Sequence, residues 1–301
     1  MTAQGGPQET STLSTGTSSP VTNSGSDGIV IRPLSSRADY DACVELQEIT
    51  WGVGFNERVP SGILKLSQLL GGVASGAFAA NGELLGFVFG ISGIRDGQLA
   101  HWSDMLAVRP GTRDRGIGEA LKWHQRARLL EAGVNVVYWT FDPLEARNAW
   151  LNFTRLGAVS REYVRDFYDA SDSPLHHGLA TDRLIVTWLL NSKPVRDRAM
   201  GNEPSPGQET CSAPVANPSS DGSAPPDIDS LRRDLDEPVI RIAIPRDLQK
   251  LKTESLSHAA QWQSVVRAAF EHYLDSGYEV TRLLRDAYQR TYVLRRRTDE
   301  P

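Results

Sequence analysis

The sequence predicts a mixed α/β fold, an α+β arrangement in which helices cover both faces of one mixed sheet. Three observations predict it. Residues 99–133 have the pattern of a strand, a glycine-containing loop and a helix. Asn81-Gly82 lies between two apolar runs, which is the strongest short-range signal of a β-hairpin. Residues 134–141 are apolar at nearly every position, as expected for a strand in the centre of a sheet.

The chain before residue 99 alternates short helical and strand patterns. Ser35 and Ser36 provide hydroxyls that can cap a helix, and apolar side chains recur at helical spacing over 40–46. Asn81-Gly82 supplies two residues that tolerate positive φ, as a tight hairpin turn requires. The other elements expected here are a strand over 29–32, a short helix over 61–70, hairpin strands over 77–80 and 84–91, and a loop over 93–97.

A second strand and helix follow the central strand–loop–helix stretch. The helix over 116–132 ends at Gly133, a residue type that favours the C-terminal cap. Asp142-Pro143 interrupts the apolar strand, and a helix over 145–156 follows. Two strands, over 163–168 and 184–190, complete the order β-α-α-β-β-β-α-β-α-β-β. By pattern alone, this order predicts a mixed α/β domain with one layer of helices on each face.

Composition divides the chain into five parts. Residues 1–27 and the Pro- and Ser-rich segment 192–237 contain few large apolar side chains, so we expect a disordered tail and a disordered linker. The main domain spans 28–191. A smaller C-terminal half-lobe spans 238–295, with a strand over 239–244, a helix over 254–274 and strands over 278–284 and 291–294, and 296–301 form a tail. The half-lobe is small, so we expect it to dock on the main domain.

Charge and cysteine usage exclude several classes of protein. The net charge of −5 argues against a protein that binds nucleic acid. The chain has two cysteines, Cys43 and Cys211, so a structural disulfide is not expected and a reducing compartment is the natural setting. The N-terminus has no basic and apolar leader pattern, and no apolar run is long enough to cross a bilayer. These features predict a soluble, cytoplasmic protein that has no membrane partner.

The loop between residues 107 and 119 has the composition of a phosphate-binding turn. It reads Arg113-Asp114-Arg115-Gly116-Ile117-Gly118, with Gly111 shortly before. Glycines let a phosphate approach the main chain, and the first turn of the following helix adds unpaired N–H groups and the positive end of its dipole. The pattern is neither the Gly-x-Gly-x-x-Gly dinucleotide fingerprint nor a P-loop, because no Gly-Lys-Ser/Thr follows. It predicts a main-chain cradle for a pyrophosphate.

The pattern Arg-x-x-Gly-x-Gly resembles the acetyl-coenzyme A (acetyl-CoA) signature of the GNAT acetyltransferase superfamily, and the resemblance covers residues 28–191. Ala107-Val108-Arg109-Pro110 before it and Glu119-Ala120-Leu121 after it fit the family context. The run 139–144 with Asn148-Ala149 resembles a little-characterised bacterial and archaeal group that carries a C-terminal extension. The resemblance implies a GNAT-like acyl-CoA N-acyltransferase fold, acetyl-CoA as the donor and a small-molecule or peptide amine as the acceptor.

The resemblance also implies which residues bind acetyl-CoA. The strand backbone at Leu106, Ala107 and Val108 would pair with the pantetheine arm as an added strand would. Amides across the loop would hold the pyrophosphate, and Asn148 would contact the cofactor near its sulfur. The loop residues concerned are Arg113, Asp114, Arg115, Gly116, Ile117 and Gly118. The side chains of the two arginines either bind phosphate or are solvated loop cations.

For catalysis, the family mechanism is direct attack of the amine within a ternary complex, which needs no protein nucleophile. A main-chain N–H near Leu106 would polarise the thioester carbonyl. Asp104 is the acid on this strand, either as the general base or in a structural ion pair. Phe153 occupies the position of the family's tyrosine acid and cannot donate a proton, which leaves the hydroxyl of Tyr168 or Tyr138, water, or no donor at all.

Three functions are therefore compatible with the sequence. The first is a cytoplasmic N-acetyltransferase, and the second is a catalytically weak acyl-CoA sensor or scaffold, which the loss of the tyrosine favours. A nucleotide-binding regulatory domain is a third. Side chains that could line the acceptor site are Trp51, Phe55, Arg58, Arg165, Asp169, His176 and His177. The histidines have no metal-ligand spacing, so no metal is expected, and the sequence is compatible with a homodimer.

Overall fold

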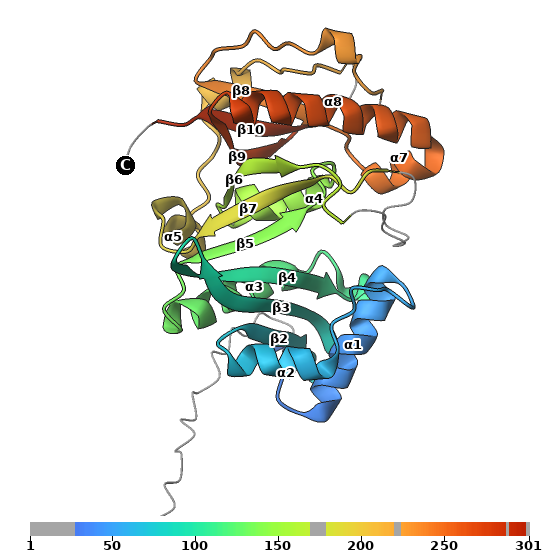
Figure 1. Cartoon of the computed structure of the whole chain (residues 1–301), viewed down its shortest axis with the longest axis vertical. Coiled ribbons are helices and arrows are strands. Elements are labelled where there is room, and N and C mark those ends of the chain that lie inside the picture. The colour runs from blue at the N-terminus through green and yellow to red at the C-terminus, as the bar shows by residue number, and fades with distance from the viewer. Residues whose placement is uncertain (1–27, 169–178, 220–223, 287–288, 299–301) are drawn as a thin grey trace, which may run out of the picture.

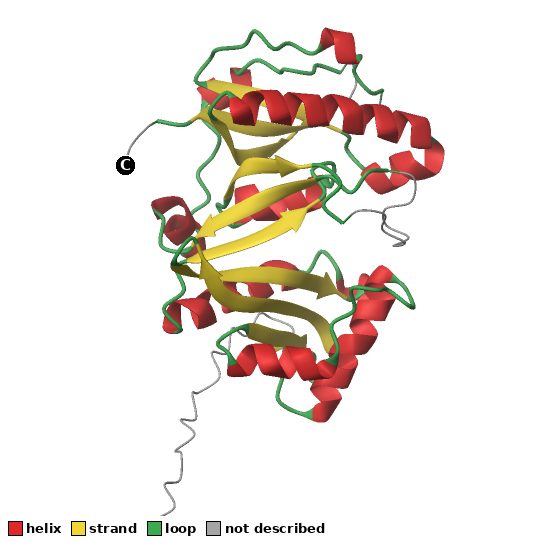
Figure 2. Ribbon diagram, viewed as in Figure 1, coloured by secondary structure: helices red, strands yellow, loops and turns green. Residues whose placement is uncertain are grey.

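A single mixed sheet runs through the whole protein. The computed structural model describes residues 28–168, 179–219, 224–286 and 289–298. Ten strands lie in the order β1-β2-β3-β4-β5-β7-β6-β9-β10-β8, with helices packed against both faces (Figures 1 and 2). The mixed α/β fold class expected from the sequence is confirmed.

The N-terminal part follows the predicted order of elements. Its strands are β1 (Val30–Pro33), β2 (Val73–Phe78), β3 (Leu84–Arg95), β4 (Gln98–Val108), β5 (Val136–Phe141), β6 (Val159–Val164) and β7 (Arg183–Leu189). Its helices are α1 (Arg37–Trp51), α2 (Ser61–Leu69), α3 (Ile117–Glu131) and α4 (Ala146–Ala149), the last continuing as a π-helix over Trp150–Arg155.

Local sequence signals account for several of these boundaries. Ser36 caps α1: its hydroxyl oxygen accepts a hydrogen bond from the Asp39 N–H. The Asp39 carboxylate accepts one from the Ser36 N–H, and the two bonds form a capping box. Gly82 has a φ of 85° in the turn between β2 and β3, and Gly133 has a φ of 78° after α3. Left-handed conformations such as these cost glycine little, so both residues fix the places where the chain reverses.

Two apolar cores lie on opposite faces of the first four strands. Phe87 and Phe89 of β3 point to the face covered by α1 and α2. Val88, between them, belongs to the core that contains α3 and the π-helix. This alternation follows from the two-residue period of a strand. It separates the face that carries α1 and α2 from the face that carries α3 and α4.

The C-terminal part extends the same sheet. It contains β8 (Val239–Ile244), α7 (Leu248–Glu254), α8 (Leu256–Asp275), β9 (Tyr278–Arg285) and β10 (Arg290–Arg296). β9 pairs with β6 at Val280 and Ser160, and Thr154 of the π-helix donates a hydrogen bond to the Leu283 carbonyl at 2.8 Å. The C-terminal piece therefore contacts the main domain, as expected. The two parts share one sheet and one apolar core.

The segment 192–237 differs from the disordered linker expected from its composition. In its described residues, α5 (Lys193–Ala199), α6 (Gln208–Ser212) and a 3-10 turn (Ile228–Ser230) form. Ala216 and Asn217 are fully buried, and the Asn217 side chain exchanges two hydrogen bonds with the Ala243 main chain at 2.9 and 2.7 Å. The segment has this structure although it is poor in apolar residues, because the main chain of the edge strand β8 provides hydrogen-bond partners for it.

Smaller differences concern element boundaries. Gly93 lies within β3, which runs to Arg95 before turning at Asp96-Gly97, because β3 and β4 pair along their whole length. β6 starts at Val159, earlier than expected, because Ser160 pairs with Val186 of β7. The π-helix was not predicted, since the sequence pattern of such a segment is the same as that of an α-helix.

Asp182 connects the main domain to α8 through a buried ion pair. Its carboxylate is fully buried and accepts hydrogen bonds from Arg267 at 2.7 and 3.0 Å and from the Tyr163 hydroxyl at 2.6 Å. We expect Asp182→Ala to lower the free energy of unfolding by about 3–5 kcal/mol, because it leaves the Arg267 charge without its partner. Urea denaturation measures this loss.

The control for this change is Asp197→Ala, which removes an exposed i,i+4 pair with Lys193. It should cost less than about 1 kcal/mol. Equal effects of the two substitutions would contradict the assignment of Asp182 as a structural connection.

Candidate active site

The sheet opens between β4 and β5. These strands are parallel, and their register pairs only His101 with Val137 and Trp102 with Tyr138. Beyond Trp102 the two strands diverge, while β4 remains paired with β3 and β5 with β7 (Figure 1). The last residues of β4 therefore present a strand edge that β5 does not cover.

Two residues of β4 direct their main-chain polar groups to this opening. The Arg109 N–H donates to the Leu85 carbonyl of the preceding strand at 2.8 Å. Because main-chain groups alternate sides along a strand, Ala107 also faces β3, whereas Leu106 and Val108 face the opening. Of the three residues expected to bind pantetheine, Ala107 therefore has its main chain engaged with β3 and its side chain buried.

A bulge lies in β4 at the point where the opening begins. Phe89 pairs with Met105 and Ile91 with Trp102, so Gly90 stands opposite two residues, Ser103 and Asp104. A Cβ atom at Gly90 would lie 2.3 Å from His101 Nε2 and 2.4 Å from the Trp102 carbonyl oxygen. The bulge therefore requires glycine at this position, and it re-aims the side chains of Ser103 and Asp104.

The loop after β4 exposes main-chain amides at the start of α3. Asp114 and Gly116 have φ values of 66° and 75°, and Gly116 is the N-cap residue of α3. Glycine has no side chain to cap the helix, so among the described residues no side chain occupies the donors of the first turn. Residues 113–116 are exposed, and no atom lies within 4 Å of a Cβ atom placed on Gly116. The loop fits an anionic ligand at the positive end of α3.

Side chains of the loop and of α4 surround these amides. Arg113 Nε donates to the Val108 carbonyl at 3.4 Å, which places its guanidinium beside the opening. Asp114 forms an ion pair with Arg147 of α4 at 2.7 Å. Arg115 is exposed, and so is Asn148, the neighbour of Arg147. The structure thus places α4 against the loop, with both arginines of the loop at the surface.

Among the known proteins compared with this chain, only solved structures are similar to it. No protein-family model matches the sequence, and no curated protein matches it either. The ribosomal-protein-S18-alanine N-acetyltransferase from Escherichia coli is 18% identical, with 55% of this chain and 95% of that chain covered at a TM-score of 0.42. A GNAT-family acetyltransferase from Streptococcus pneumoniae is 16% identical, with 53% and 98% covered at a TM-score of 0.43. Arabidopsis thaliana Naa50, solved with the bisubstrate analogue CoA-Ac-MVNAL, is 14% identical, with 53% and 97% covered at 0.39.

Three features occur together in residues 30–189: the strand order β1-β2-β3-β4-β5-β7-β6, the opening after Trp102, and the uncapped loop before α3. This arrangement agrees with the one that the Arg-x-x-Gly-x-Gly resemblance implied, and the loop lies where the sequence analysis expected it.

Asp104 lies at the bulge, on the side of the loop between α1 and α2. Its side chain is exposed, but surrounding protein atoms hinder solvation and, together with the nearby Glu57 carboxylate, raise the pKa of Asp104. A hydrogen bond with Trp102 opposes this shift. Asp104 has no ion-pair partner among the described residues, so the expected alternative of a structural ion pair is not what the structure has.

Tyr168 lies across the opening from Asp104, over β5. Its hydroxyl is 3.3 Å from the Thr140 hydroxyl, and the neighbouring Phe167 ring stacks on Trp102 of β4 with ring centroids 6.3 Å apart. The segment after β6 therefore bridges the two diverging strands. Tyr138, the other candidate donor, is covered by the Arg95 guanidinium at 4.1 Å from its ring centroid.

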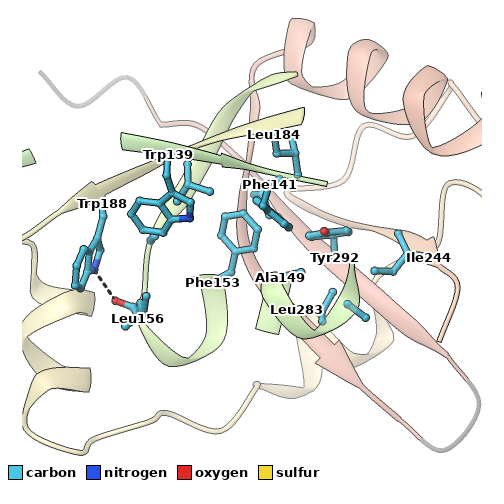
Figure 3. Close-up of a cluster of buried hydrophobic side chains, with 14 of the residues drawn as sticks. Trp139, Phe141, Ala149, Phe153, Leu156, Leu184, Trp188, Ile244, Leu283 and Tyr292 are labelled. Carbon is cyan, nitrogen blue, oxygen red and sulfur yellow. Dashed lines mark hydrogen bonds between the residues drawn. The ribbon is translucent and has the colours of Figure 1, made fainter. Parts of the chain in front are cut away.

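Phe153 is fully buried in the larger apolar core. Its ring packs against those of Phe141 and Tyr292, whose centroids lie 5.7 and 5.9 Å away (Figure 3). The ring is part of the apolar core that joins the main domain to β10. Phenylalanine at this position therefore has a packing role.

We expect Phe153→Tyr to lower the free energy of unfolding by about 1–3 kcal/mol, because the new hydroxyl would be buried without a partner. We also expect no gain in turnover from this change. Thermal denaturation and a thiol-release assay measure the two effects. Phe55→Tyr, at a half-buried surface position where water can reach the new hydroxyl, is the matched control for stability and should leave the free energy of unfolding unchanged. A faster and equally stable Phe153→Tyr protein would contradict the prediction.

The side chains expected to line the acceptor site are largely engaged in packing. Trp51 stacks on Phe55 at 5.7 Å and packs edge-on against Phe87. Arg58 and Arg165 form ion pairs with Glu48 and Glu271. Asp169, His176 and His177 lie outside the described residues.

Sequence analysis missed a buried polar network between α3 and β4. Lys122 is 2% exposed, and its ammonium donates to Ser103 Oγ at 2.9 Å and to Gln125 Oε1 at 3.0 Å. It also lies 3.8 Å from the centroid of the Trp139 ring. Gln125 in turn contacts His101 at 3.1 Å, and burial lowers the pKa of His101 to about 3. A lysine on an otherwise polar stretch of α3 gave no signal of this network.

Burial lowers the pKa of Lys122 to about 7, and within the described chain no carboxylate pairs with it. The unfolded chain, with a pKa near 10.5, binds one more proton than the folded chain between these values, so raising the pH stabilises the fold. We expect wild type to gain stability relative to Lys122→Met from pH 7 to 10, measured by urea unfolding. Lys193→Met, at an exposed position, is the control. Parallel pH profiles of wild type and Lys122→Met would contradict this.

Membrane-spanning helices and metal clusters are both absent from the described part of the chain. None of the helices described is long and apolar enough to cross a membrane. Within the same residues, no group of three or more His, Cys, Asp or Glu side chains could hold a metal ion.

Proposed function

We propose that this protein is an N-acetyltransferase that moves an acetyl group from acetyl-CoA to the amine of a small molecule or peptide. One observation carries the proposal: the strand edge at Leu106 and Val108, which β5 does not cover, runs directly into the uncapped amides at the start of α3. A pantetheine arm has amide groups that can pair with a strand edge, and its pyrophosphate is an anion that suits these amides.

The binding residues follow from this match. Leu106 and Val108 pair with the pantetheine amides, and the main chain over 113–118 holds the pyrophosphate. Asn148 contacts the donor from α4. Arg113 and Arg115 add charge-assisted contacts to the phosphate oxygens. The free cysteines Cys43 and Cys211 support a reducing, cytoplasmic setting for this activity.

The proposed reaction forms one C–N bond and breaks one C–S bond. The neutral amine attacks the thioester carbonyl carbon directly, and the Leu106 N–H donates to the carbonyl oxygen as negative charge develops on it. The Asp104 carboxylate accepts the amine proton through a water molecule, and its raised pKa suits this role. The Tyr168 hydroxyl donates a proton to the leaving thiolate. The products are an acetylated amine and free CoA.

The test is release of free thiol from acetyl-CoA, measured with a panel of small amines and peptides that have free N-termini. CoA binding is measured in parallel by calorimetry. We expect thiol release above the amine-free rate with at least one class of acceptor. CoA binding without thiol release from any amine would refute the transfer activity, and the absence of CoA binding would refute the whole proposal.

A further inference from the structure

The C-terminal hairpin places an arginine beside the candidate CoA loop. Arg285, at the end of β9, stacks its guanidinium on Trp150 at 4.3 Å from the ring centroid. Trp150 directly follows α4, whose Arg147 pairs with Asp114 of the loop at 2.7 Å. Figure 3 shows the β9–β10 hairpin running alongside α4. A residue far away in the sequence thus reaches the surroundings of the loop.

Arg285 belongs to a group of cations at this end of the hairpin. In the β9–β10 register it stands opposite Arg290, and Arg246 follows the neighbouring strand β8. Arg290 directs its guanidinium to the main-chain carbonyls of Asp286 and Gln289, at 2.6 and 3.1 Å. Among the described residues, Arg285 is in no ion pair and has the Trp150 ring as its contact. The Asp286 carboxylate offsets part of the Arg290 charge, whereas the charge of Arg285 is not paired with a carboxylate of the described chain.

The electrostatic interactions agree with this placement. Burial lowers the pKa of Arg285, and the charges of Arg290 and Arg147 lower it further, whereas Asp114 opposes them. Arg285 is thus close enough to α4 and to the loop for the charges of Arg147 and Asp114 to shift its pKa. Like charges that repel one another in the free protein are relieved when an anion binds among them.

We propose that Arg285, with Arg147 and Arg290, forms a subsite for a phosphomonoester, and that its ligand is the 3′-phosphate of CoA. This rests on the proposed function, in which the adjacent loop holds the pyrophosphate. The ribose phosphate is attached to the same nucleotide as the pyrophosphate, so it has to lie near the loop. Guanidinium groups bind phosphate oxygens through two parallel hydrogen bonds, and a stacked guanidinium is already oriented for such contacts.

The test compares CoA with dephospho-CoA, which lacks only the 3′-phosphate, by calorimetry on the full chain. We expect wild type to bind CoA at least tenfold more tightly than dephospho-CoA. Arg285→Gln should reduce that ratio to near one while leaving the affinity for dephospho-CoA unchanged. Arg290→Gln, which keeps the contact with Trp150, should reduce the ratio in part. Arg297→Gln, at an exposed position beyond the opposite end of β10, is the control and should change nothing.

The outcomes separate this inference from the proposed function. If wild type binds both compounds equally well, or if Arg285→Gln keeps the preference for CoA, the subsite is refuted and the proposed function stands. If wild type binds neither compound, the proposed function fails as well. If Arg285→Gln loses affinity for both compounds equally, Arg285 has a structural role and the subsite is refuted.

Discussion

Gly116→Glu should lower the affinity for CoA at least about 100-fold and abolish acetyl transfer. Gly116 is the N-cap of α3 and has a φ of 75°, so a side chain there is strained and points into the space in front of the loop amides. Its carboxylate would compete with a phosphate for the same donors and repel it. Loss of two charge-assisted hydrogen bonds, at about 1.5–3 kcal/mol each, accounts for this factor.

Calorimetric titration with CoA measures the effect of Gly116→Glu. The matched control is Gly82→Glu in the turn between β2 and β3, where φ is 85° and no atom lies within 4 Å of the added Cβ atom. It introduces the same charge and a similar backbone strain away from the loop, so CoA affinity should stay at the wild-type value. Unchanged binding by Gly116→Glu would remove the basis of the acetyl-CoA assignment.

Asp104→Asn should lower kcat by about 10²–10⁴-fold with little change in the affinity for CoA. The amide cannot accept the proton of the attacking amine, whereas it keeps the shape of the bulge. In wild type, activity should rise with pH as Asp104 loses its proton, and its raised pKa places this rise above the range of an ordinary aspartate. In the variant this rise should disappear.

Glu57→Gln provides a second test of the same assignment. The Glu57 charge contributes to the raised pKa of Asp104, so its removal should move the rise in activity to lower pH and leave the maximal rate unchanged. The pH profile of kcat/KM for wild type and both variants measures these effects. A wild-type rate in Asp104→Asn, or a rise that Glu57→Gln does not move, would exclude Asp104 as the base.

Local signals in the sequence were sufficient for the main-domain fold and for the loop. The Asn81-Gly82 turn, the capping serine Ser36 and the glycines at 116 and 133 each fix a chain reversal or a helix end through their own backbone preferences. The order of elements followed from these signals. The resemblance implied that the backbone at Leu106 and Val108 meets a ligand, but the place where β4 and β5 part was not predicted, since no residue pattern records where two parallel strands diverge.

Long-range contacts account for what the sequence did not predict. The segment 192–237 is poor in apolar residues, yet Ala216 and Asn217 are buried because β8 lies beside them. Arg285 reaches the surroundings of the loop only because β9 pairs with β6. Lys122, whose pKa burial lowers, contacts Trp139 and Ser103, which come from two different strands. Each of these contacts joins residues that are far apart in the chain, so no local sequence pattern predicts it.

The pairing of β6 with β9 has a consequence for how this protein is made. The strand beside Ser160 begins at Tyr278, so during synthesis β6 leaves the ribosome long before its neighbour exists. Until then the growing polypeptide presents an open sheet edge and a half-covered apolar layer, the features that chaperones recognise and that promote aggregation. The sheet is therefore completed only when the last strands have been made, and a premature stop codon before Tyr278 would leave the N-terminal part with that edge permanently bare.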